Sequence, residues 1–167
     1  MSAPHVKLLR TISFDQSDRA VYDLAAADGE WAVSGAFAFA DSDLSAIKGK
    51  PRQAFANGFL GLNGFGRSTF AVVCEATADD RNEAAYRLAR HFVERYGAPD
   101  VETALPVADS EIDFAAGLAD GQPINTVLTV RRIAGADGGI KEEFRTIRPP
   151  SGEPMHARVW TVDQDET

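Results

Sequence analysis

The chain has 167 residues, of which 44% are hydrophobic and 25% are charged, a composition typical of one folded domain rather than of a disordered chain. Its formal net charge of −8 would repel nucleic acid and anionic membranes, so neither is expected as a partner. A single cysteine, no signal-like N-terminus and no long apolar run together predict a cytoplasmic protein.

The first forty residues carry strand-like stretches before any helix signal. A β-branched and apolar run at 6–14 predicts a strand. Segments 20–25 and 31–40 predict a hairpin, because Asp28-Gly29 between them is a favoured turn dipeptide. Bulky and small residues alternate in the second of these segments, which indicates a strand with one face close to a neighbour.

The following stretch is rich in glycine and phenylalanine. Aspartates at 41 and 43 are suitable N-caps for a short helix at 44–48, and a second short helix is expected at 51–57. A glycine-rich loop then leads into 67–76, where apolar and β-branched residues predict a buried strand. Residues 49–70 are called the Gly/Phe segment below.

Two helices are predicted in the middle of the chain. Residues 80–96 repeat apolar side chains with the spacing of an amphipathic helix, and Gly97 would end it. Asp79 or Asp80 would cap this helix, with Glu83 completing a capping box if Asp80 is the cap. A second helix is expected at about 109–119.

Strands are expected again at the end of the chain. Segments 125–134 and 140–148 predict a hairpin, 155–162 a last strand, and 163–167 a flexible acidic tail. Strands therefore occupy both ends of the chain and helices its middle. This order predicts a single α+β domain over 1–162, with a largely antiparallel β-sheet and the two main helices packed on one face.

One stretch partly matches a phosphate-binding loop. Residues 61–68 fit the pattern except that Arg67 stands in place of its lysine. The pattern should leave a strand and open a helix, whereas here it leads into the expected strand at 67–76. We interpret it as a glycine-rich turn.

The Gly/Phe segment is the best candidate for an interaction surface. Glycine lets a backbone approach a partner closely, and aromatic side chains beside it would form an exposed apolar groove. The alternative is that these aromatic residues anchor a long loop to the core. The predicted binding residues are Arg52, Phe55, Asn57, Phe59, Asn63, Phe65 and Arg67.

Signals for catalysis and for metal binding are missing from the sequence. The three histidines, His5, His91 and His156, lack metal-site spacing, and no serine-nucleophile motif is present. We therefore predict no catalytic residue, no metal and no cofactor. His91 is interpreted as a surface residue of its helix.

The basic residues near the C-terminus have an ordinary interpretation. On the expected hairpin, Arg131 or Arg132 would lie opposite Glu142 or Glu143 and form surface ion pairs across the strands. The alternative is a positive patch that docks an acidic partner or an anionic ligand.

Most of the chain resembles an uncharacterised bacterial family of small cytoplasmic proteins. The resemblance rests on KLLRTISFD, on GEWAVSGAFAFA and on RQAFANGFLGLNGFGRSTF. It implies no defined activity, and it implies a link to the maturation of redox metalloenzymes.

Three functions remain open on these observations. The favoured one is a non-catalytic accessory or binding protein that uses the Gly/Phe segment to bind a protein partner. A small enzyme acting on an anionic metabolite would instead bring Arg52, Arg67 or Arg132 together with a histidine or carboxylate in a pocket. The third is a homo-oligomer, such as a homodimer, with the Gly/Phe segment as its subunit interface.

Overall fold

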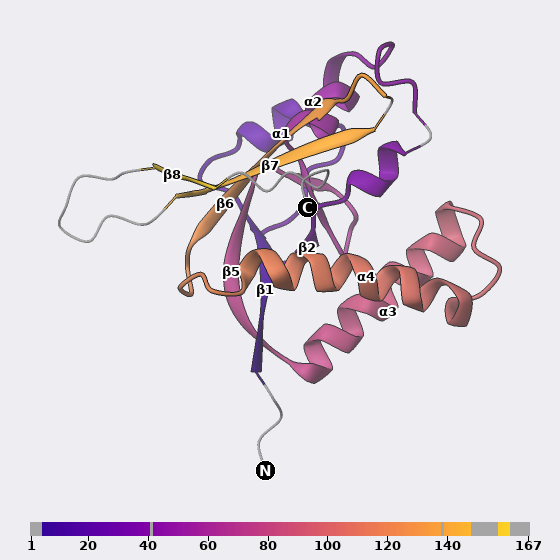
Figure 1. Cartoon of the computed structure of the whole chain (residues 1–167), viewed down its shortest axis with the longest axis vertical. Coiled ribbons are helices and arrows are strands. Elements are labelled where there is room, and N and C mark those ends of the chain that lie inside the picture. The colour runs from indigo at the N-terminus through magenta and orange to yellow at the C-terminus, as the bar shows by residue number, and fades with distance from the viewer. Residues whose placement is uncertain (1–4, 41, 138, 148–156, 161–167) are drawn as a thin grey trace.

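The computed structural model describes residues 5–40, 42–137, 139–147 and 157–160. The strands pair antiparallel in one sheet, in the order β4-β3-β2-β1-β5-β6-β7-β8 (Figure 1). They are β1 (His5–Ile12), β2 (Trp31–Val33), β3 (Phe59–Gly61), β4 (Arg67–Ser68), β5 (Phe70–Thr77), β6 (Val127–Ala134), β7 (Ile140–Ile147) and β8 (Ala157–Trp160). The helices are α1 (Ser17–Val21), the 3₁₀ turn η1 (Ala36–Phe39), α2 (Gly49–Asn57), α3 (Ala78–Arg95) and α4 (Val101–Ala119).

Two long strand pairs form the middle of the sheet. β1 and β5 pair over their whole length, from His5 opposite Thr77 to Ile12 opposite Phe70. β6 and β7 form the hairpin that the sequence predicts, in which Val127 lies opposite Ile147. β2, β3 and β4 extend the sheet on the other side of β1.

The helices α3 and α4 pack against this sheet and against each other, which confirms the predicted α+β class. α4 crosses β1 and β2, and α3 contacts β5 and β1 (Figure 1). Small and apolar side chains on both helices join the core, because close packing of helix on helix and helix on sheet requires them. The buried ones are Ala84, Ala85, Leu88, Ala89 and Phe92 on α3, and Ala104, Ala108, Ile112, Ala115 and Ala119 on α4. In the described part of the chain, no helix is long and apolar enough to cross a membrane.

The predicted cap of α3 and the predicted start of α4 were wrong. α3 is capped by Thr77, whose hydroxyl accepts from the Asp80 N–H at 3.0 Å while the Asp80 carboxylate accepts from the Thr77 N–H. α4 begins at Val101 rather than near 109, with Asp100 as its cap. Pro106 lies inside α4. Because proline removes one helical hydrogen bond, its presence in the sequence argues against a helix at this position.

Several smaller elements differ from those expected. The hairpin of 20–25 with 31–40 does not form, because β2 pairs with β1 and the chain leaves the strand at Gly35, whose φ is 79°. Residues 44–46 form a turn, and no helix forms at 44–48. The strand expected at 67–76 is interrupted at Thr69, whose N–H donates to the Asp18 carboxylate at 3.2 Å. The predicted tail at 163–167 and the domain end at 162 lie outside the described residues.

Candidate functional site

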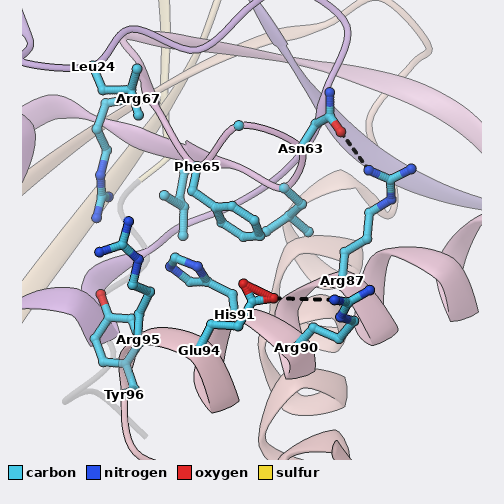
Figure 2. A pocket seen from close by; sticks show the side chains of 13 residues that line it. Leu24, Asn63, Phe65, Arg67, Arg87, Arg90, His91, Glu94, Arg95 and Tyr96 are labelled. Carbon is cyan, nitrogen blue, oxygen red and sulfur yellow. Dashed lines mark hydrogen bonds and ion pairs between the residues drawn. The ribbon is translucent and has the colours of Figure 1, made fainter.

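A pocket with a volume of about 760 Å³ lies between the end of α3 and the loop that joins β3 to β4. Figure 2 shows its walls: Asn63, Phe65 and Arg67 come from the loop and β4, and the opposite wall comes from α3 and Tyr96. This volume lies in the range of small-molecule sites, which is about 300–1,000 Å³.

The face of α3 that meets the pocket is strongly basic. Arg87, Arg90, His91, Glu94 and Arg95 all line the pocket, and they recur at the i, i+3, i+4 spacing of one helix face. The adjacent face of α3 is the apolar one that joins the core. The amphipathic pattern of this helix therefore determines which of its side chains line the pocket.

Arg67 is the most unusual residue of the pocket. Its side chain is only 8% exposed, and it forms no ion pair with any described residue. Its guanidinium donates to the carbonyl oxygens of Gly58 and Gly35, both at 3.2 Å. These bonds use two of its five N–H groups, so three have no acceptor in the described chain.

The surroundings of Arg67 are built to admit a buried guanidinium. A Cβ on Gly35 would lie 2.6 Å from both the Arg67 Nη1 atom and the Leu60 Cβ atom, and Gly35 has a φ of 79°, so only glycine fits there. Burial, and then the charge of Arg132, lowers the pKa of Arg67 to about 9. Arg67 is therefore still cationic at neutral pH.

Phe65 and His91 form an aromatic wall across the middle of the pocket. Their rings stack in parallel with centroids 3.8 Å apart, and Tyr96 meets the His91 ring edge-on at 5.4 Å. Phe65 has a φ of 59°, a left-handed backbone conformation that is costly for a residue with a large side chain. Burial, Arg95 and Arg67 lower the pKa of His91 from its ordinary 6.5, and Glu94 opposes them.

Glu30 fixes the loop that carries Phe65. Its buried carboxylate accepts from the backbone N–H groups of Ala27, Asn63 and Gly64, at 2.8 to 2.9 Å. In a phosphate-binding loop such N–H groups would donate to the ligand, but here they donate to the Glu30 carboxylate. The segment after the loop forms β4 and β5 and no helix, so the interpretation as a glycine-rich turn before a strand is confirmed.

The four arginines of the pocket differ in how their charges are balanced. Arg87 donates to Asn63 at 2.6 Å and pairs with Glu83, and Arg90 pairs with Glu94 at 3.5 Å. For Arg95, as for Arg67, the described residues provide no ion pair. In Figure 2 the guanidinium groups of Arg67 and Arg95 point toward one another at the same end of the pocket. That end carries unbalanced positive charge.

The pocket brings together three of the seven predicted binding residues, namely Asn63, Phe65 and Arg67. Phe55 and Phe59 are 5% and 0% exposed, so they do not form the exposed apolar groove that the sequence predicts. They pack on other aromatic rings, as the alternative of a loop anchored to the core requires.

The other two predicted binding residues lie on α2 and do not line the pocket. Arg52 is exposed there. The side chain of Asn57 donates to the Val130 carbonyl oxygen at 3.2 Å, and this bond ties α2 to β6.

Two sequence interpretations of charged residues need correction. His91 is half-buried in the pocket rather than on an open surface. Arg132 does pair with Glu142, with a distance of 2.9 Å from Nε to Oε2, but both side chains are almost fully buried. This pair therefore belongs to the interior and not to a positive surface patch.

Sequence reasoning missed the contribution of α3 to the site. In the sequence the apolar stripe predicts this helix and His91 is interpreted as a surface residue, but no role is predicted for Arg87 or Arg95. The signal that could have found it is the run of four-residue spacings between basic residues on one helix face of an acidic protein.

Fold and pocket together define an α+β protein with a basic, arginine-lined cavity. The chain belongs to a family of unknown function, DUF6505, which matches residues 6–163. The predicted resemblance to an uncharacterised family over most of the chain is thereby confirmed at that level. Neither the curated proteins nor the solved structures contain a match to the chain.

Proposed function

We propose that the protein is a non-catalytic binding protein that holds an anionic ligand in the pocket between α3 and the β3–β4 loop. The observation that carries the proposal is Arg67, a buried cation that lines a cavity and has no carboxylate partner in the described chain. Burying an unpaired charge is costly, and a bound anion would offset that cost.

The remaining charges of the pocket support this proposal. The protein as a whole carries −8, yet the pocket is lined by four arginines and one glutamate. The unbalanced pair, Arg67 and Arg95, comes from β4 and α3, and these two elements hold the cations on opposite walls. An anion between them would bridge the sheet and the helix layer.

Binding of simple anions to the purified protein tests the proposal. Isothermal titration calorimetry with inorganic phosphate, sulfate and citrate should show binding to the unmodified protein. Arg95→Gln should weaken it about tenfold or more, because a hydrogen bond to a charged group contributes about 1.5–3 kcal/mol. Arg52→Gln removes an exposed arginine outside the pocket and should leave affinity unchanged. Equal binding by Arg95→Gln, or no binding of any anion, would refute the proposal.

The other functional hypotheses stay predictions. A small enzyme acting on an anionic metabolite would use the same pocket, since Arg67 and His91 both line it. The predicted protein partner, self-association and link to redox-metalloenzyme maturation rest on the sequence alone. Turnover of a bound metabolite would favour the enzyme over the binding protein.

A further inference from the structure

The end of the pocket at Arg67 and Arg95 offers more hydrogen-bond donors than a carboxylate can use. Arg67 has three side-chain N–H groups without an acceptor among the described residues, and the guanidinium of Arg95 donates no hydrogen bond to a described residue. A carboxylate has two oxygens with about four acceptor sites and one negative charge, whereas a phosphate monoester has three terminal oxygens and a charge of up to −2. Two cations on opposite walls therefore match a phosphate better.

The neighbouring aromatic wall is suited to a flat organic group. Phe65 has a left-handed backbone conformation that glycine would adopt at lower cost. Glycines occupy neighbouring positions of the same loop, yet a phenylalanine stands at this one. Its ring stacks on His91 and lines the cavity beside the cationic end. Backbone strain retained at an aromatic side chain that faces a pocket is typical of a binding role.

The volume of the pocket and the ion pairs of Arg87 and Arg90 indicate how many phosphate groups the ligand carries. A cavity of about 760 Å³ is far larger than one phosphate group needs, given that a water molecule occupies about 30 Å³. Arg87 and Arg90 are already bonded to Asn63, Glu83 and Glu94, so the far end offers no second unbalanced cation. This arrangement favours one phosphate on an organic body over a ligand with two separated phosphates.

We infer that the pocket binds a soluble phosphate monoester with a flat ring, its phosphate between Arg67 and Arg95 and its ring against the Phe65–His91 wall. This inference rests on the proposed function and specifies its ligand class. The net charge of −8 disfavours the phosphate of an anionic membrane lipid as the source.

Calorimetry with matched probes tests the inference. Phenyl phosphate should bind about tenfold or more tightly than benzoate, which has the ring and a carboxylate, because the phosphate uses additional charged donors. It should also bind about three- to tenfold more tightly than inorganic phosphate, because a ring stacked on an aromatic wall contributes about that factor. Phe65→Leu should remove the advantage over inorganic phosphate. Phe14→Leu alters an exposed phenylalanine outside the pocket and should change nothing.

Each contrary outcome has a separate meaning. Equal affinity for benzoate would overturn the phosphate preference and leave the proposed anion binding intact. Equal affinity for inorganic phosphate would overturn the ring subsite. Binding to vesicles of phosphatidic acid, without binding of phenyl phosphate, would overturn the soluble ligand, and no binding of any probe would refute the proposed function as well. Amide chemical shifts of Phe65 and His91 on addition of phenyl phosphate to the unmodified protein check the location without any variant.

Discussion

His91 connects the charge of the pocket to the stability of the fold. Its ring lies on Phe65 and next to Tyr96, and the charged groups that shift its pKa are Arg95, Glu94 and Arg67. Burial is the largest cause of its lowered pKa, followed by the charge of Arg95. The neutral imidazole is therefore the form that the folded pocket favours.

We predict that the protein without ligand loses stability as the pH falls below about 6.5, and that His91 contributes to this loss. The unfolded chain binds a proton at His91 near its ordinary pKa of 6.5, while the folded chain resists it, so the stabilisation is present above that pH and is lost below it. Because the His91 ring is only partly buried, screening by solvent should keep this contribution small. Urea unfolding of His91→Phe, which keeps a stacking ring, should show a smaller loss between pH 7.5 and 5. An unchanged slope would show that other groups carry the dependence.

The helices and strands that could be predicted from the sequence are those with a local periodic pattern. The β6–β7 hairpin and the apolar face of α3 follow from local periodicity, which the sequence displays directly. The region around 20–40 was mispredicted because its strand pairs with β1 and ends at Gly35 to make room for Arg67, a residue more than thirty positions away. Asn63, Phe65 and Arg67 were found because they lie in the unusual Gly/Phe segment. Their partners on α3 were not found, because the spacing of basic residues on that helix does not indicate which distant element its basic face meets.

The β3–β4 loop depends on one buried carboxylate, and we predict that Glu30→Gln loosens it. A glutamine can still accept hydrogen bonds through its oxygen, but its NH₂ group would face the backbone N–H of Ala27 or of Asn63 and Gly64, leaving a buried donor unpaired. Such a loss costs about 1–3 kcal/mol. Hydrogen exchange should become faster at these amides, and anion binding should weaken because the loop carries Phe65.

Glu83→Gln is the matched control for this variant. Glu83 is exposed on α3 and, among the described residues, pairs with Arg87 alone, so the loss of this pair should change stability by a few tenths of a kcal/mol. Exchange at Asn63 and Gly64 that is as slow in Glu30→Gln as in the unmodified protein would contradict the role assigned to Glu30.

At the scale of the whole molecule, Arg132 joins parts of the chain that are far apart in sequence. From β6 it pairs with Glu142 on β7, donates to the Phe55 and Gly58 carbonyl oxygens at 2.9 Å, and donates to the Ser34 carbonyl oxygen after β2. The Gly58 carbonyl oxygen also accepts from Arg67. The interior cation network and the proposed anion site therefore share an atom.

We predict that Arg132→Met destabilises the fold by about 3–5 kcal/mol, because it breaks a buried ion pair by removing one of its two members. The double variant Arg132→Met with Glu142→Leu removes both charges and should recover part of this loss, since a buried pair replaced by apolar residues is often close to neutral. Chemical denaturation of both variants measures the difference. A double variant no more stable than Arg132→Met would contradict this account. It would show that the hydrogen bonds from Arg132 to carbonyl oxygens, and not its ion pair with Glu142, hold α2 and β2 to the β6–β7 hairpin.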